Sequence, residues 1–170
     1  MQPVFETPRL ILRPRTLADT DECLAMDRDP LVTRFVDGPW SDARKHRAFV
    51  EARTLGPYPA GMGYWTIRSR NDAADFLGWV LLIPADAVGP EIEIGWRLPR
   101  KAWGSGIATE AATAVLQHAF ATLRLAEVVA EIDPLNLASI RVAEKLGLVR
   151  RGDVVGHGRA MVRYASMEKL

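Results

Sequence analysis

The middle of this chain constrains the fold most, because three local patterns follow one another there. Residues 91–98 (EIEIGWRL) alternate apolar with polar or small side chains, which predicts a strand with one buried face. Residues 101–106 (KAWGSG) form a glycine loop, and residues 109–123 repeat apolar side chains at helical spacing. A helix that begins directly after glycines presents unpaired N–H groups and the positive end of its dipole. The segment therefore predicts an anion-binding turn between a strand and a helix.

The glycine loop by itself leaves two interpretations open. A tight turn from strand to helix also needs glycine for its backbone angles, and short glycine patterns are weak evidence of a ligand. Two related nucleotide motifs do not match. The dinucleotide fingerprint requires a third glycine where Thr109 stands, and the phosphate loop of nucleoside triphosphatases requires a Gly-Lys-Ser/Thr sequence that the loop lacks. The loop is either a structural turn or a site for another anion.

The remaining patterns predict one α/β (α+β) domain over residues 1–170, with a mixed, mostly antiparallel sheet of about six to seven strands flanked by helices. The predicted strands cover residues 9–15, 64–69, 76–83, 91–98, 127–132, 148–151 and 154–166, the last two around Gly156-His157-Gly158. The predicted helices cover an irregular stretch near residues 17–26, then residues 41–55 with Ser41 as N-cap, 109–123, and 136–146 closed by Gly147. Residues 56–63 are expected to form a loop.

Composition excludes several classes of protein. The chain carries 22 basic and 21 acidic side chains, without the basic excess typical of nucleic-acid-binding proteins. No apolar stretch is long enough to span a bilayer, and the first residues do not resemble a signal peptide. Cys23 is the only cysteine, and it shows no metal-binding spacing with His46, His118 or His157. We therefore expect a cytoplasmic protein with no metal, no membrane contact and no nucleic-acid partner.

Four motifs together resemble one family. Residues 101–111 (KAWGSGIATEA) resemble the acetyl-coenzyme A loop of the GCN5-related N-acetyltransferases (GNAT), and most closely its RimJ/RimL branch of ribosomal-protein N-terminal acetyltransferases. Residues 7–14 (TPRLILRP), 93–96 (EIGW) and 133–147 (DPLNLASIRVAEKLG) resemble the opening strand, central strand and last helix of that branch. The resemblance implies the GNAT fold, acetyl-coenzyme A as cofactor, an amine as acceptor, and no metal.

The resemblance also implies which residues bind the coenzyme. They come from the central strand, the glycine loop and the last helix: Ile94, Gly95, Trp96, Arg97, Lys101, Ala102, Trp103, Gly104, Ser105, Gly106, Ile107, Ala108, Asn136, Ser139, Arg141 and Lys145. Lys101 stands where members often have glutamine or arginine, and lysine meets phosphate as a point charge without a bidentate fork. Ala143 stands where many members have a tyrosine that protonates the leaving thiolate.

Acetyl transfer to an amine requires a base that keeps the amine neutral and a donor for the developing oxyanion. The resemblance makes Glu93 the candidate base, with Glu91 on the same strand face as the alternative. A solvated strand glutamate is an equally good interpretation of Glu93. A backbone N–H near Gly95 or Trp96 is the expected oxyanion donor.

The departing thiolate benefits from a hydrogen bond, and the resemblance makes Ser139 the candidate donor. Asn136 is expected to contact the coenzyme or the reacting centre. Both residues also suit a purely structural interpretation, in which Asn136 caps a helix and Ser139 is its third residue. Arg141 and Lys145 lie four residues apart on one helix face, where they could meet phosphates or simply face solvent.

The sequence thus predicts an N-acetyltransferase that transfers the acetyl group directly to a primary amine. The acceptor is either the α-amine of a protein N-terminus or a small-molecule amine, and the chain is a monomer or a homodimer. The alternative is a catalytically inactive module that binds acyl-coenzyme A and serves as a sensor or scaffold.

Overall fold

The computed structural model describes residues 1–156 and 158–167, so the predicted turn residue His157 lies outside the described part. The strands are β1 (Phe5–Glu6), β2 (Leu10–Pro14), β3 (Gly63–Ser69), β4 (Phe76–Pro84), β5 (Ile92–Arg97), β6 (Glu127–Ile132), β7 (Val149–Gly156) and β8 (Arg159–Met167). The α-helices are α1 (Thr20–Asp27), α2 (Ala43–Leu55), α3 (Ile107–Ala121) and α4 (Leu137–Lys145). No helix in the described ranges is long and apolar enough to cross a membrane.

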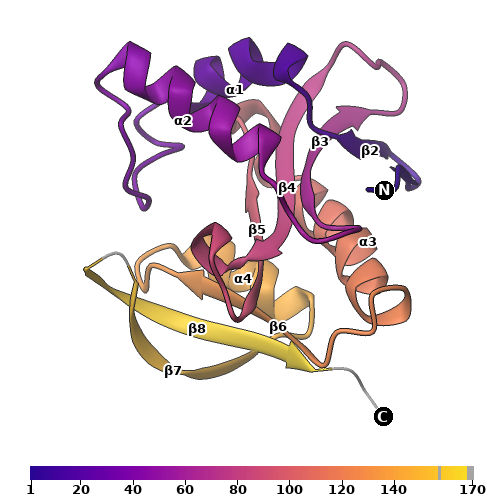
Figure 1. The fold of residues 1–170 in the computed structure, drawn as a ribbon, viewed down its shortest axis with the longest axis vertical. Helices are drawn as coiled ribbons and strands as arrows, with labels where there is room; N and C mark the ends of the chain where they lie inside the picture. The colour runs from indigo at the N-terminus through magenta and orange to yellow at the C-terminus, as the bar shows by residue number, and fades with distance from the viewer. Residues whose placement is uncertain (157, 168–170) are drawn as a thin grey trace.

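The strands form one sheet in the order β1-β2-β3-β4-β5-β6-β8-β7 (Figure 1). All neighbours pair antiparallel except β5 and β6, so the predicted mixed, mostly antiparallel sheet is confirmed. The sheet has eight strands rather than six to seven, because β1 is only two residues long and too short to show a periodic pattern. The parallel strands β5 and β6 share a single register pair, Glu93 with Val129, so the sheet is open beyond that point.

Alternating side chains of the sheet pack into two separate cores, as the period-two geometry of strands requires. One core joins Leu12, Ile67 and Ile94 to α3 and α4. The other core joins Tyr64 and Leu81 to α1 and α2. The two helix pairs therefore cover opposite faces, and Figure 1 shows α1 and α2 together at the top of the view with β7 and β8 at the bottom.

Two predicted helix starts differ from the structure. Helix α2 is capped by Asp42 and not by Ser41, because the Asp42 Oδ1 accepts hydrogen bonds from the backbone N–H groups of Arg44 (3.1 Å) and Lys45 (2.9 Å). Aspartate and serine are about equally good caps, so the sequence could not separate them. Helix α3 begins at Ile107, two residues before the predicted start, directly after the glycine loop.

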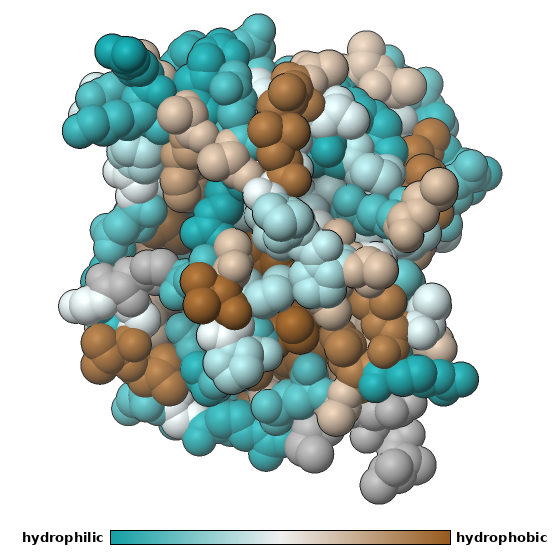
Figure 2. Space-filling view, in the orientation of Figure 1, coloured by the Kyte–Doolittle hydropathy of each residue, from teal (hydrophilic) through white to brown (hydrophobic). Residues whose placement is uncertain are grey.

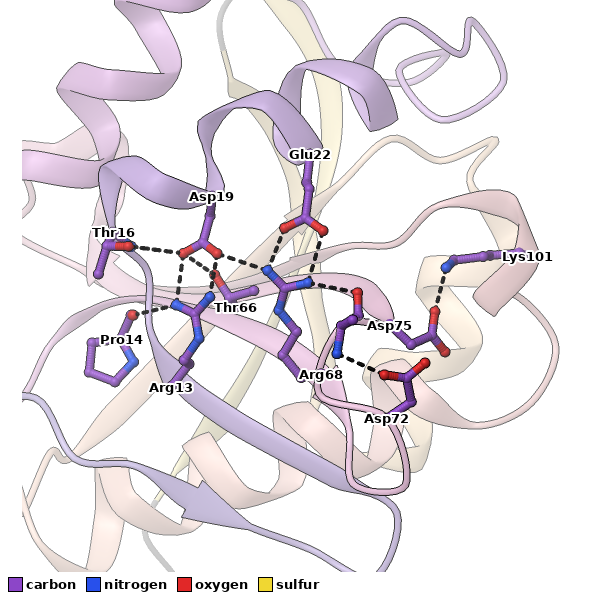
Figure 3. A network of polar contacts seen from close by, with 11 residues as sticks. Arg13, Pro14, Thr16, Asp19, Glu22, Thr66, Arg68, Asp72, Asp75 and Lys101 are labelled. Atoms are coloured by element: carbon purple, nitrogen blue, oxygen red, sulfur yellow. Dashed lines mark hydrogen bonds and ion pairs between the residues drawn. The ribbon is translucent and has the colours of Figure 1, made fainter.

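A network of ionic contacts fixes the start of α1 to the sheet (Figure 3). The Asp19 side chain, 1% exposed, accepts hydrogen bonds from Arg13 Nη2 (2.5 Å), Arg68 Nη2 (3.0 Å) and Thr66 Oγ1 (3.0 Å). Arg68 also donates to Glu22 on α1. Burial alone would raise the pKa of Asp19, but its hydrogen bonds, led by those from Arg13, lower the pKa to about 2. Each arginine in this network therefore has a carboxylate partner.

Candidate active site

The glycine loop turns the chain from β5 into α3 with two residues in left-handed conformations. Gly104 has φ of 72° and Gly106 has φ of 79°, a region that side-chain-bearing residues rarely adopt. A Cβ atom at Gly104 would meet nothing within 4 Å, so glycine is needed there for its backbone angle and not for space. No side chain caps the first turn of α3, which leaves its N–H groups open to an anion, as the sequence predicts.

Contacts from Arg9, the residue directly before β2, hold this loop in place. The Arg9 side chain donates from Nη1 to the Ser105 carbonyl (2.8 Å) and from Nε to the Glu110 carboxylate in the first turn of α3 (2.6 Å). The Ser105 hydroxyl donates to the Ala102 carbonyl (3.1 Å). These contacts hold the loop in one conformation before a ligand binds.

A cavity of about 760 Å³ extends from this loop, through the opening between β5 and β6, to the face covered by α1 and α2. Figure 2 shows brown apolar side chains between the part of the molecule that holds α1 and α2 and the part that holds β8. Most residues predicted to bind the coenzyme line this cavity: Ile94, Gly95, Trp96, Arg97, Ala102, Trp103, Gly104, Gly106, Ile107, Ala108, Asn136, Ser139, Arg141 and Lys145. Thr109 and Val142, which the sequence did not single out, line it as well.

Lys101 and Ser105 do not line the cavity. The Lys101 Nζ forms an ion pair with the Asp75 carboxylate (2.5 Å) beside a separate, smaller pocket. Ser105 has its hydroxyl turned to the Ala102 carbonyl, as described above. Arg97 lines the cavity, but its Nη1 donates to Asp27 on α1 (2.9 Å) and so faces the α1–α2 side.

Helix α4 contributes the other wall at the loop end. Asn136 is the N-cap of α4, and its Oδ1 accepts a hydrogen bond from the Ser139 N–H (3.2 Å). The exposed side chains of Arg141 and Lys145 line the mouth of the cavity, where two cations suit an anionic ligand. Ala143 is completely buried in the core and lies outside the cavity lining, so the hydroxyl that α4 offers to the cavity is that of Ser139.

Glu93 lies on β5 at the register pair with β6, where its half-buried side chain lines the cavity. Burial raises the pKa of Glu93 to about 7, with smaller contributions from the carboxylates of Asp86 and Glu131. A carboxyl group that titrates near neutral pH is suited to accept a proton from an ammonium group. Glu91, the alternative base, does not line the cavity, and its carboxylate accepts a hydrogen bond from Arg163 Nη1 (3.2 Å).

Beyond Glu93, the edge of β5 that faces β6 has no ladder partner, because the two strands share only that register pair. Gly95 and Trp96 lie on this stretch and line the cavity. An added Cβ at Gly95 would lie 3.3 Å from Leu81 on β4, so the strand is tightly packed on its α1–α2 face. The geometry therefore permits a backbone N–H group at this edge to donate a hydrogen bond to an oxyanion.

The far end of the cavity is built from side chains that the sequence did not mark as functional. Phe35, Phe49 and Trp79 supply apolar wall, and Arg15 and Arg53 supply positive charge. Two other tryptophans, Trp40 and Trp65, do not line the cavity, and Trp65 is completely buried in the α3-side core. These residues come from widely separated segments, so no spacing in the sequence connects them.

Comparison with known proteins places the chain in a class. The family model described as an acetyltransferase (GNAT) domain matches residues 9–149. The uncharacterized protein YkkB of Bacillus subtilis is 33% identical over 141 residues, 81% of each chain. The FsC-acetyl coenzyme A-N(2)-transacetylase of Aspergillus fumigatus is 30% identical over 86% of this chain and 65% of its own. An acetyltransferase structure from Agrobacterium tumefaciens has a TM-score of 0.81 at 27% identity, covering 99% of this chain and 96% of that one.

The fold, the family model and these relatives together define an acetyltransferase. The chain belongs to the GNAT family. It is an acyltransferase that uses acetyl-coenzyme A and acts on amines. The glycine loop suits this coenzyme, because open N–H groups and left-handed glycines let the backbone approach a pyrophosphate closely.

Proposed function

We propose that this enzyme transfers the acetyl group directly to a primary amine, on a peptide N-terminus or a small molecule, with Glu93 as the base. The observation that carries the proposal is that one cavity joins the glycine loop to Glu93. Acetyl-coenzyme A supplies an acetyl group activated as a thioester. An amine and a thioester can therefore occupy the two ends of the cavity and meet beside Glu93.

In this mechanism Glu93 accepts a proton from the ammonium group of the acceptor, directly or through one water molecule. The backbone N–H groups at the open edge of β5 donate to the thioester oxygen, where negative charge develops. Ser139 donates a hydrogen bond to the departing thiolate, and Asn136 orients the start of α4. The open first turn of α3, with Arg141 and Lys145, binds the phosphates.

Direct transfer is also supported by the state of the one thiol in the chain. Cys23 lines the cavity, where burial raises the pKa of its thiol to about 11. A thiol with such a pKa is protonated at neutral pH and is a poor nucleophile. The proposed mechanism therefore has no acetyl-cysteine intermediate.

We also propose that residues 1–170 form a single acetyltransferase domain of the RimJ/RimL type. The proposal rests on the residues 7–14, 93–96, 101–111 and 133–147, which resemble that branch in the same order. Their positions in the structure, on β2, β5, the glycine loop and α4, are compatible with it.

The deciding experiment measures free thiol released from acetyl-coenzyme A in the presence of different amines. The panel contains peptides with free N-termini, polyamines and amino acids, with the N-acetylated form of each as its control. We expect thiol release with at least one class of free amine and none with its acetylated form. Tight coenzyme binding without thiol release across the panel would instead support the inactive sensor or scaffold.

A further inference from the structure

Arg15 occupies the acceptor end of the cavity, directly after β2. Its backbone N–H donates to the Tyr64 carbonyl (2.9 Å), which fixes the residue beside β3. Its guanidinium stacks on the Tyr64 ring, 3.7 Å from the ring centroid, and lies 5.8 Å from the centroid of Trp79. The residue is 8% exposed and lines the cavity. A permanently charged group is therefore held between aromatic rings at the cavity wall.

The Arg15 guanidinium lacks the partners that a buried cation normally has. Its Nε and Nη2 atoms are buried and have no hydrogen-bond partner among the described residues. Burial of an unpaired charge costs several kcal/mol. Arg13, two residues earlier on the same strand face, has Asp19 as its carboxylate partner in the network of Figure 3. Of these two neighbouring arginines, Arg13 is thus paired and Arg15 is unpaired among the described residues.

The neighbouring carboxylate does not compensate Arg15. Asp27 also lines the cavity, but its Oδ1 accepts from Arg97 (2.9 Å) and its Oδ2 lies 3.0 Å from His46 Nε2. Arg53, a second cavity-lining arginine, stacks over Phe49 and adds positive charge. Asp86 and Glu93 also line the cavity, so the charges there are mixed, but the buried Arg15 nitrogens have no carboxylate partner among the described residues. An anionic group of a ligand would supply that partner.

The register of the sheet locates this positive charge relative to the reaction. Tyr64 on β3, which contacts Arg15, pairs with Leu81 on β4. Leu81 in turn pairs with Gly95 at the open edge of β5. With strands about 4.8 Å apart, Tyr64 and the guanidinium above it lie roughly 10 Å from Gly95 across the sheet. An anionic group bound by Arg15 would be part of the acceptor and would lie several bonds away from the reacting amine.

We propose that Arg15 binds a carboxylate of the acceptor, so that the preferred substrates are amines that carry a carboxylate several bonds away from the amino group. This inference rests on the proposed acetylation of amines and adds the substrate class. Short peptides and amino acids with a terminal side-chain amine have this chemistry. The carboxylate gives Arg15 the partner that residues 1–156 and 158–167 do not supply.

The first test compares acceptors that differ in one group. A series of ω-amino acids of increasing chain length is assayed beside the matching ω-amino amides and O-phosphoethanolamine. We expect kcat/KM to favour the longer amino acids over their amides by at least about 30-fold, because truncating a buried charge pair costs 2 kcal/mol or more. Equal rates for acids and amides, or a preference for the phosphate, would overturn the assignment.

The second test changes the protein. Arg15→Met keeps most of the packing volume and removes the charge, and we expect the ratio of kcat/KM between acid and amide to fall to about 1. The exposed Arg44→Met serves as the matched control and retains the wild-type ratio. Acetyl-coenzyme A affinity reports whether each variant is folded, and Arg15→Gln, which also removes the charge, replaces Arg15→Met if the latter does not fold. A wild-type ratio in the Arg15 variant would disprove the role of Arg15.

Ligand binding gives a readout that does not depend on turnover. In the presence of coenzyme A, a longer ω-amino acid should raise the Tm of the wild-type protein more than its amide does, and this difference should vanish in Arg15→Met. The two proposals fail separately. Absence of thiol release with every amine defeats the proposed function, whereas turnover or binding without selectivity for carboxylates defeats only the assignment of Arg15.

Discussion

The two ends of the cavity are made from different parts of the polypeptide. The proposed coenzyme end is made largely of backbone: left-handed Gly104 and Gly106, and the uncapped first turn of α3. The proposed acceptor end is made of side chains, among them Arg15, Arg53 and Trp79. Glu93 and the open edge of β5 lie where the two ends meet.

This difference teaches which part of the site is common to the class and which part is specific. A backbone site depends on a few glycines at fixed spacing, so it can be recognised in a sequence and be shared by many enzymes. A side-chain site depends on residues from several elements that only the folded chain brings together. The acceptor end can therefore differ between relatives that bind the same coenzyme.

Gly104→Asp is the substitution expected to weaken acetyl-coenzyme A binding most while leaving the acceptor end unchanged. The substitution places a carboxylate at the proposed site of the coenzyme phosphates, and it puts a side chain on a residue with φ of 72°. Loss of about 3 kcal/mol of charge-assisted hydrogen bonding corresponds to a drop of at least about 100-fold in acetyl-coenzyme A affinity, measured by calorimetry.

Gly104→Asn is the matched control, because asparagine has the same shape, carries no charge and tolerates left-handed angles better than most residues. The space around Gly104 is open, so neither variant should misfold for steric reasons. Affinity of the aspartate variant equal to that of the asparagine variant would contradict a phosphate site at the loop.

Where the two ends meet, Glu93→Gln should lower kcat about 100-fold or more, as expected for loss of a general base. The base acts when deprotonated, so the wild-type rate should fall as pH drops below the Glu93 pKa of about 7. The glutamine variant should lack this decrease, and acetyl-coenzyme A affinity should change little. The measurement is the rate of each variant as a function of pH, from about pH 5.5 to about 9.

Glu91→Gln distinguishes the two candidate bases. Glu91 pairs with Arg163 and lies outside the cavity lining, so its substitution should leave the pH profile of the rate unchanged. If the decrease in rate at low pH were lost in Glu91→Gln and retained in Glu93→Gln, Glu91 and not Glu93 would be the base.

A smaller effect is expected at the leaving group. Ser139→Ala removes one neutral hydroxyl donor and leaves the N-cap bond from the Ser139 N–H to Asn136 intact. A hydrogen bond of about 1 kcal/mol corresponds to a loss of roughly fivefold in kcat. The loss should shrink with a thioester whose thiol has a lower pKa, because a better leaving group needs less stabilisation. An unchanged rate with both thioesters would rule out Ser139 as the donor.

The smallest effect concerns stability. The pKa of Glu93 is raised in the folded state, from 4.5 to about 7, so ionisation of this group opposes folding as pH rises through that interval. Glu93→Gln should therefore have a Tm a few degrees above wild type at pH 8 and close to wild type at pH 4.5, measured by calorimetry without ligand. Equal Tm differences at both pH values would mean that Glu93 is not desolvated.

The parts of the structure that could be predicted from sequence are those with local patterns. The alternation in residues 91–98, the glycine loop and the Asn136 cap each depend on neighbouring residues, and each is found in the structure. The pairing of Lys101 with Asp75 could not be predicted, because it joins side chains from distant segments across the surface.

The residues of the acceptor end could not be predicted from the sequence for a related reason. Alternation in residues 9–15 predicts a basic strand face, and such a face is usually solvated. In the structure α1 and α2 cover this face, so Arg15 is buried, while Arg13 stays partly exposed and pairs with Asp19. A run of arginines on a strand that is followed by two helices was the signal available in the sequence.

The opening between β5 and β6 has a consequence for protein engineering. The α1–α2 wall beside this opening is built from chain segments that precede β3, whereas the glycine loop follows β5. Substitutions in that wall can alter what the enzyme accepts while the loop keeps its shape. A library confined to Val32, Phe35 and Phe49 would therefore explore new acceptors on a scaffold whose coenzyme recognition stays constant.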